Sequence, residues 1–199
     1  MAYYLRVLTP SSGAVSTAVL KEPLRRERAH LRPHIDSPTW TALEVVGPSG
    51  DTLCSIERNV VEPRSPGEEE VTEFRDEIAD CLPRSAAAWL AEYLLSVRTI
   101  YALQVHDATF ARDGWGVVGS AHHAIWKAAG GIIQADGEGF SNEEGYHILW
   151  QFPDNATGPW NMAVVKDGRW LTFGMDLGNA AHRHAFKEGE IPEGVQPSR

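Results

Sequence analysis

An amphipathic helix followed at once by an apolar strand constrains the fold of this chain more than any other stretch. Residues Ser85–Val97 carry apolar side chains at the spacing of one helix face, from Ala86 through Leu94 to Val97. The next segment, Thr99–His106, is almost continuously apolar, as expected for a central strand covered on both faces. The helix needs an apolar surface on which to pack. The two segments therefore predict layers of helix and sheet around one core.

Two further helices are indicated by the same periodicity. Glu68–Leu82 opens with three glutamates, where acids favour the positive end of the helix dipole, and it has apolar residues at helical spacing. Trp115–Ala129 ends at Gly130-Gly131, as glycine often does beyond a helix C-terminus. The buried face predicted for this helix consists of Trp115, Val118, His122, Ile125, Trp126 and Ala129.

β-rich runs bounded by turn signals predict the strands. They are Tyr3–Leu8, Thr41–Val46, Thr52–Arg58, Ile132–Ala135, Tyr146–Phe152, Met162–Val165 and Trp170–Phe173. Asp167-Gly168 separates the last two, and Asp-Gly is a preferred two-residue hairpin turn. Thr99–His106, the helix after it and Ile132–Ala135 form a βαβ unit, so we expect its two strands to be parallel neighbours.

These elements predict a single α+β domain. Its mixed sheet would contain one βαβ unit and a C-terminal antiparallel meander, covered by about three helices. The domain would span residues 1–187, with a hairpin region at 1–62, a helical and βαβ region at 68–136 and the meander at 140–187, leaving 188–199 as a tail. The predicted core is Trp89, Leu90, Tyr93, Leu94, Ile100, Leu103, Val105, Ile125, Trp126, Ile133 and Ile148.

The charge of the chain narrows the classes of partner. Among 199 residues, 27 are acidic and 18 are Lys or Arg, for a net charge of -9. Nucleic acids and anionic membranes attract positive surfaces, so we expect neither as a partner. The chain has no apolar run near the roughly 20 residues of a membrane span, and its first residues lack a signal-peptide pattern. We therefore expect a cytoplasmic protein whose two cysteines, Cys54 and Cys81, are free thiols.

Polar residues recur on one face of three predicted strands. By strand alternation, Gln104 shares a face with His106, Gln134 with Asp136, and His147 with Gln151. An unpaired buried amide costs roughly 1–3 kcal/mol, so these side chains need partners. The pattern fits a glutamine network that fixes strand register better than it fits a polar pocket, because the three faces need not lie on the same side of the sheet.

The loop from Asp136 to Glu144 concentrates acids beside glycines. Asp136 and Glu138 lie on one turn, and Glu143 and Glu144 follow within a few residues. Such carboxylates suit a hard divalent cation, but they also suit a solvated loop, and the run lacks the EF-hand pattern. His182 and His184 could share zinc only if their segment were extended. We expect no metal and no cofactor.

A basic segment, Lys21–Arg32, stands out in this acidic chain and includes His30, with His34 close behind. One interpretation is a patch for phosphate or for an acidic partner. The other is a surface segment whose arginines pair with carboxylates of the same chain.

The leading functional hypothesis is a non-enzymatic, acidic, protein-binding protein. It would resemble an immunity protein in neutralising a basic partner such as a toxin, because complementary charge speeds encounter. The residues predicted to bind are Asp136, Glu138, Glu143, Glu144, Gln104, Gln134, Gln151 and Trp160. The alternative is a hydrolase in which Asp136 and Glu138 act with His106 or His147, around a divalent metal or as general acid and base.

Overall fold

The computed structural model describes residues 3–32, 39–111 and 113–198. The chain is α+β, which confirms the predicted class. It folds into two compact units that interleave in sequence. Unit 1 comprises residues 1–69 and 97–136, and unit 2 comprises residues 70–96 and 137–199.

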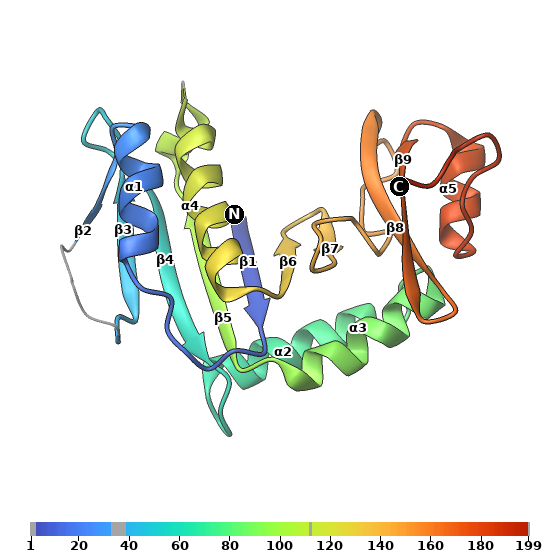
Figure 1. The fold of residues 1–199 in the computed structure, drawn as a ribbon, viewed down its shortest axis with the longest axis horizontal. Coiled ribbons are helices and arrows are strands. Elements are labelled where there is room, and N and C mark those ends of the chain that lie inside the picture. The colour runs from blue at the N-terminus through green and yellow to red at the C-terminus, as the bar shows by residue number, and fades with distance from the viewer. Residues whose placement is uncertain (1–2, 33–38, 112, 199) are drawn as a thin grey trace. The chain divides into compact units, whose positions relative to one another are not determined.

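Unit 1 is built on an antiparallel sheet whose strands lie in the order β2-β3-β4-β5-β1-β6. Helices α1 and α4 lie side by side on one of its faces (Figure 1). The strands are β1 (Tyr3–Thr9), β2 (His30–Arg32), β3 (Ala42–Val46), β4 (Thr52–Val60), β5 (Thr99–Val105) and β6 (Ile132–Ala135). The helices are α1 (Ala18–Arg26), the short 3-10 helix η1 (Asp107–Phe110) and α4 (Gly114–Ala129).

The N-terminal strand corrects the predicted sheet. β5 and β6 are parallel to each other, but β1 lies between them and pairs antiparallel with both. The two strands of the βαβ unit are therefore not neighbours, and the pairings in the described part of unit 1 are antiparallel rather than mixed. The reason is visible in β1 itself, where Val7, Leu8 and Thr9 are fully buried. A strand buried on both faces belongs in the middle of a sheet.

The core of unit 1 forms between α1, α4 and the sheet face that they cover. Leu20 and Leu24 of α1 and Val118 and Ile125 of α4 meet Leu103 of β5 there. The face of α4 differs from the predicted one, because Trp115 remains 40% exposed while Val117 and Ala121 are buried. Small residues such as Ala121 let the helix approach its neighbours closely, and the bulky ring at the helix start stays outside.

Unit 2 combines helices with a two-stranded ribbon. Helix α2 (Pro66–Ile78) starts in unit 1 and continues into unit 2, where α3 (Arg84–Ser96) and α5 (Ala180–Lys187) also lie. The strands are β7 (Gly139–Ser141), β8 (Pro159–Lys166) and β9 (Arg169–Asp176). The β8–β9 turn has positive φ at both Asp167 and Gly168, 52° and 71°, which confirms the predicted two-residue hairpin.

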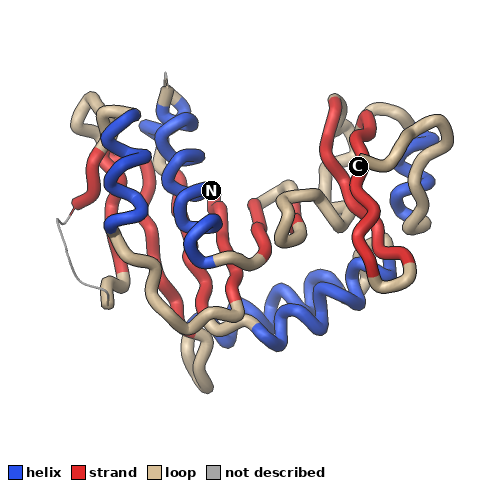
Figure 2. The backbone as a smooth tube through the Cα atoms, viewed as in Figure 1, coloured by secondary structure: helices blue, strands red, loops and turns tan. Residues whose placement is uncertain are grey.

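The predicted strand Tyr146–Phe152 is wrong. This segment is irregular, with isolated bridges at His147 only, and Figure 2 draws it as loop. Its backbone groups bind several segments in turn: His147 N–H donates to Asn161, Ile148 N–H to Phe140 and Trp150 N–H to Leu82. A strand pairs with one neighbour over its length. An apolar run that is shared among several partners cannot form such a ladder.

The C-terminal residues belong to unit 2. Ile191 and Val195 pack on the core made by Phe173, Phe186 and their neighbours, and Ser198 N–H donates to the Thr172 carbonyl at 2.6 Å. Of the predicted core residues in the whole chain, Leu90, Leu94, Ile100, Leu103, Val105, Ile125 and Ile148 are buried. Trp89, Tyr93, Trp126 and Ile133 are half-buried.

Candidate functional site

The face of the unit 1 sheet opposite α1 and α4 gathers polar residues from neighbouring strands. Gln104 of β5 lies opposite Ser55 of β4 and Tyr4 of β1, and Asp136 follows β6 beside Tyr4. In the next row, Arg6 lies opposite Gln134. Residues directly opposite in an antiparallel pair point to the same side of the sheet. The predicted residues Gln104, Gln134 and Asp136 therefore share one face, which we call the polar face.

Arg6 organises the polar face electrostatically. Its Nη1 donates to Gln134 Oε1 and to Asp136 Oδ1, both at 2.6 Å, and its guanidinium lies 4.7 Å from the centre of the Tyr4 ring. Asp136 Oδ2 accepts the Tyr4 backbone N–H at 2.9 Å. The carboxylate is thus held as an ion pair that joins β1 to β6, with only 33% of its side chain exposed. A carboxylate in this state is poorly placed to act as a general base or as a metal ligand.

His106 pairs with Ser55 on the same face. Ser55 Oγ and His106 Nε2 are 2.9 Å apart, which is the contact that a nucleophilic serine makes with its base. Nucleophilic catalysis also needs an acid that orients the imidazole and free donors for an oxyanion. Ser55 lies inside β4, which pairs with β3 on one side and β5 on the other. Its surroundings are those of a sheet interior and lack the exposed backbone amides of a nucleophile turn.

His147 lies in the interior of unit 2, with its ring stacked on Phe152 at 4.7 Å and edge-on to Trp160 at 5.0 Å. Its Nε2 donates to the Glu138 carbonyl at 2.6 Å, so Nδ1 is the acceptor of the Ser141 hydroxyl at 3.1 Å. Burial lowers the pKa of His147, and the hydrogen bond to Glu138 offsets this only in part. Both ring nitrogens are occupied within the core, and the imidazole is neutral near pH 7.

Glu143 and Glu144 lie exposed on a turn that Asn142 fixes. The Asn142 side-chain oxygen accepts the N–H groups of Glu144 at 3.1 Å and Tyr146 at 2.9 Å, and its own backbone binds Tyr146 and Gly145. An asparagine that bonds backbone groups ahead of it is typical of a defined turn. The two carboxylates are therefore presented on an ordered support. Glu143 lies close enough to Tyr93 to raise the pKa of its hydroxyl, although burial is the larger cause.

The other predicted binding residues of unit 2 have structural contacts. Gln151 Nε2 donates to Glu77 at 2.8 Å, and a Cβ at Gly139 would come within 2.4 Å of the Gln151 side-chain oxygen. Trp160 packs edge-on against Phe152 and His147. Glu138 is half-buried and holds His147 through its backbone carbonyl.

The basic segment forms ion pairs within unit 1. Glu22 accepts hydrogen bonds from Arg25 and Arg26, which lower the pKa of its carboxyl. Arg32 binds Glu44 at 2.8 Å and the Thr52 hydroxyl at 2.8 Å. These contacts are those expected when the arginines pair with carboxylates of the same chain. His34 lies outside the described residues.

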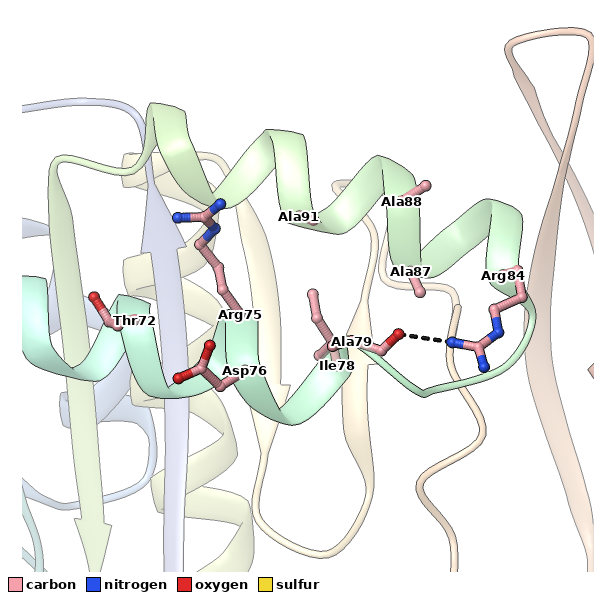
Figure 3. A pocket seen from close by; sticks show the side chains of 9 residues that line it. All are labelled: Thr72, Arg75, Asp76, Ile78, Ala79, Arg84, Ala87, Ala88 and Ala91. Atoms are coloured by element: carbon pink, nitrogen blue, oxygen red, sulfur yellow. Dashed lines mark hydrogen bonds between the residues drawn. The ribbon is translucent and has the colours of Figure 1, made fainter.

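A groove of about 420 Å³ runs between α2 and α3 in unit 2 (Figure 3). Arg84, at one end, donates to the Ala79 carbonyl at 2.7 Å and so caps the end of α2. The lining residues are Thr72, Arg75, Asp76, Ile78, Ala79, Arg84, Ala87, Ala88 and Ala91. This set contains none of the residues predicted from the sequence to form a site.

The described residues contain no cluster of three or more His, Cys, Asp or Glu side chains that could hold a metal ion. His182 and His184 lie on helix α5, two positions apart, so their side chains point in different directions. Cys54 and Cys81 are free, as predicted, and burial raises the pKa of Cys54 to about 12. Within residues 3–32, 39–111 and 113–198, no helix has the length and apolarity to cross a bilayer.

The negative charge of the chain is concentrated in unit 2. Unit 1 contains 11 Lys or Arg and 12 Asp or Glu residues, for a net charge of -1. Unit 2 contains 7 Lys or Arg and 15 Asp or Glu residues, for a net charge of -8. Its described ion pairs between side chains join Arg84 to Asp80 and Lys166 to Glu190. Most acids of unit 2 therefore add to an unbalanced negative field.

Comparison with known proteins returned no relative. No family model, no curated protein sequence and no solved structure matches the chain.

Several residues that matter for these surfaces were not singled out from the sequence. Tyr4 and Arg6 are two positions apart on β1 and therefore share a face, as Gln104 and His106 do at the end of β5. Strand alternation could have predicted this from the sequence. The contact of Arg6 with Asp136 spans 130 positions and has no local signal. Phe110, which is 63% exposed, is the other omission, and Trp115, which is 40% exposed, was predicted to be buried.

Proposed function

We propose that this chain is a non-enzymatic binding protein that captures a basic protein partner through the acidic surface of unit 2. Neutralisation of a basic toxin by an immunity-type protein is the activity that this arrangement suits best. The observation that carries the proposal is the segregation of charge, with a net -8 in unit 2 against -1 in unit 1. A field of one sign accelerates encounter with an oppositely charged surface and disfavours partners of like charge.

The Glu143–Glu144 turn is the proposed centre of this surface. Both side chains are exposed, and the turn is braced by the buried Asn142. A preorganised pair of carboxylates loses little conformational entropy when it binds a cation, which favours affinity. Of the acids predicted to bind, Glu143 and Glu144 are the exposed candidates, because Asp136 is paired with Arg6 and Glu138 is half-buried.

The hydrolase alternative has less support from the geometry. It needs Asp136 and a histidine as free acid–base groups, and the carboxylate of Asp136 is bound by Arg6 and by the Tyr4 amide. The candidate base His147 has both nitrogens occupied in the core. A cytoplasmic site of action is part of the proposal, and two free thiols are consistent with a reducing compartment.

Co-purification from the native cell tests the proposal. The chain is compared with the double variant Glu143→Gln/Glu144→Gln and with a matched control, Glu57→Gln/Glu62→Gln, which removes the same charge from exposed positions of unit 1. We expect a basic protein to be retained by the wild type and the control and to be lost by the first variant. Salt between roughly 0.05 and 0.5 M should release it. Retention by all three chains at high salt, or recovery of a small-molecule product, would contradict the proposal.

A further inference from the structure

Three aromatic rings of unit 1, two of them exposed and one half-buried, form a cluster. The Phe110 and Trp115 rings meet edge to face with centroids 5.5 Å apart, and Tyr3 meets Trp115 in the same way at 5.8 Å. Phe110 is 63% exposed and Trp115 is 40% exposed, which are high values for such large side chains. We call Tyr3, Phe110 and Trp115 the aromatic patch. Clustered exposed aromatic residues are typical of the energetic centre of a protein interface.

The support beneath the aromatic patch is tightly built. The Thr109 hydroxyl donates to the Leu53 carbonyl at 2.5 Å, and His106 N–H donates to the same oxygen at 2.8 Å. A Cβ at Gly114 would lie 2.4 Å from the Thr109 carbonyl oxygen, so only glycine allows α4 to start this close to η1. The backbone between η1 and α4, which carries Phe110 and Trp115, is therefore held in a defined conformation by these contacts.

The charge around the aromatic patch indicates the kind of group that it would receive. Asp107 and Phe110 are three positions apart on the 3-10 helix η1, where residues at i and i+3 lie on the same side. Asp113 precedes α4, and its side chain makes no capping hydrogen bond to the helix. Asp107 and Asp113 are both exposed, and Asp113 is two positions before Trp115 in sequence, while Arg112 lies outside the described residues. Aromatic faces with nearby carboxylates attract cationic side chains.

Unit 1 already contains one example of this arrangement. The Arg6 guanidinium lies over the Tyr4 ring at 4.7 Å and is paired with the Asp136 carboxylate at 2.6 Å. Arginine suits such a site better than lysine, because its planar group stacks on a ring while its N–H groups bind a carboxylate.

We propose that the aromatic patch receives an arginine side chain of the partner, with its guanidinium on the face of Trp115 and beside Asp107. This inference rests on the proposed function, since it assumes a basic partner, and it adds a second contact surface, in unit 1. In this arrangement the field of unit 2 speeds the encounter, and the aromatic patch supplies a specific anchor.

The test uses two synthetic peptides on the full chain. One has three arginines separated by Gly-Ser pairs, and the other has citrulline in place of each arginine, which keeps the shape and removes the charge. Nuclear magnetic resonance follows the indole N–H signals, with that of Trp115 identified by Trp115→Phe. We expect the Trp115 signal to shift saturably with the arginine peptide and to remain unchanged with the citrulline peptide. Phe110→Ala should weaken this binding by about threefold or more.

Two further variants separate charge from apolar contact. Asp107→Asn should weaken binding about twofold at 0.05 M salt and have almost no effect at 0.5 M. Leu95→Ser, at an apolar side chain of unit 2 that is 52% exposed, is the matched control and should bind as the wild type does. Hydrogen exchange in β4 and β5 shows whether each variant remains folded.

The outcomes distinguish this inference from the proposed function. If the arginine peptide shifts the amides of Glu143–Gly145 and leaves Trp115 unchanged, the inference is wrong and the proposed function stands. If both peptides shift Trp115 equally, the aromatic patch binds apolar groups and the arginine assignment is wrong. A titration in which no signal of either unit moves would count against both.

Discussion

The two units handle their acidic side chains in opposite ways. In unit 1, acids and bases are nearly balanced, and ion pairs such as Arg6–Asp136 and Arg32–Glu44 join strands. Unit 2 has 15 acidic and 7 basic side chains, and Glu143 and Glu144 are exposed on their turn. Ion pairs between acidic and basic side chains stabilise unit 1, whereas unit 2 has too few basic side chains to balance most of its acidic ones. An unbalanced field disfavours the compact state, and the proposed function would give that field a use outside the unit.

The buried histidines of the two units show the opposite contrast. His147 in unit 2 is satisfied at both nitrogens, whereas His122 in unit 1 has a buried Nε2 that no hydrogen bond reaches. Burial lowers the pKa of both. The comparison separates a histidine with both ring nitrogens hydrogen-bonded from one that bonds the Arg6 backbone and leaves its Nε2 without a partner among the described residues.

The largest expected effects test whether the two units are separate folding units. Phe173→Ala removes a fully buried ring from the core of unit 2 and should cost about 3–5 kcal/mol, while Leu103→Ala in unit 1 should cost about 2–5 kcal/mol. Native-state hydrogen exchange reports on β9 and β5 separately. We expect each variant to lower protection mainly in its own unit. Equal loss in both strands from either change would show that the units unfold together.

Removing single carboxylates should sharpen the difference between the two kinds of acid. Asp136→Asn leaves Arg6 without its ion pair, and we expect a loss of about 1–3 kcal/mol, measured by urea unfolding. Glu143→Gln/Glu144→Gln should leave the free energy of unfolding unchanged or slightly higher, because it relieves repulsion between like charges. A stable Asp136→Asn variant would mean that the polar face does not depend on its ion pair.

Substitutions of the two buried histidines should change the free energy of unfolding by amounts similar to those of the carboxylate substitutions. His147→Phe leaves the Ser141 hydroxyl and the Glu138 carbonyl unpaired, so it should cost about 1–3 kcal/mol. His122→Phe removes one hydrogen bond to the Arg6 backbone and a buried Nε2 without a partner among the described residues, so it should cost about 1 kcal/mol or less. Urea unfolding at pH 7.5 measures both. A larger loss from His122→Phe would reverse the roles assigned to the two rings.

The lowered pKa values of His147 and His122 predict that the stability of the fold depends on pH. Their folded pKa values are lowered below the ordinary 6.5, so the unfolded chain takes up protons first as the pH falls. Their contribution to stability is complete above pH 6.5 and declines as the pH falls through 6.5 toward the folded pKa values. Unfolding measured at pH 7.5 and 5.5 should show this decline, and His147→Phe should reduce the slope.

Local patterns in the sequence predicted much of this fold. The stripe of Ser85–Val97 corresponds to α3, the apolar run after it to β5, and Asp167-Gly168 to the β8–β9 turn. Each is determined by residues that are close in sequence. The insertion of β1 between β5 and β6 could not be seen in this way, because strand order depends on pairings between distant segments.

The candidate sites were harder to predict for the same reason. Strand alternation placed Gln104 and Gln134 on definable faces, but whether those faces coincide depends on the pairing of both strands with β1. The role of Asp136 is set by Arg6, 130 positions away. His147 was assigned to a strand, and its burial between Phe152 and Trp160 follows from tertiary packing that no local period encodes.

The smallest expected effect concerns salt, and it tests the charge comparison most directly. Like charges in unit 2 repel, and ions shorten the range of that repulsion from about 10 Å at 0.1 M to about 3 Å at 1 M. Raising sodium chloride from 0.05 to 0.5 M should therefore increase the stability of unit 2, by less than about 1 kcal/mol, since exposed charges interact weakly. Unit 1, at a net -1 with paired charges, should be unchanged or slightly less stable.

Hydrogen exchange in β8 and β9, compared with that in β4 and β5, measures the stability of both units in one sample. Glu143→Gln/Glu144→Gln should reduce the response of unit 2 without changing that of unit 1. Equal stabilisation of the two units would indicate a general salt effect on apolar burial, and the segregation of charge would then have no energetic consequence within the fold.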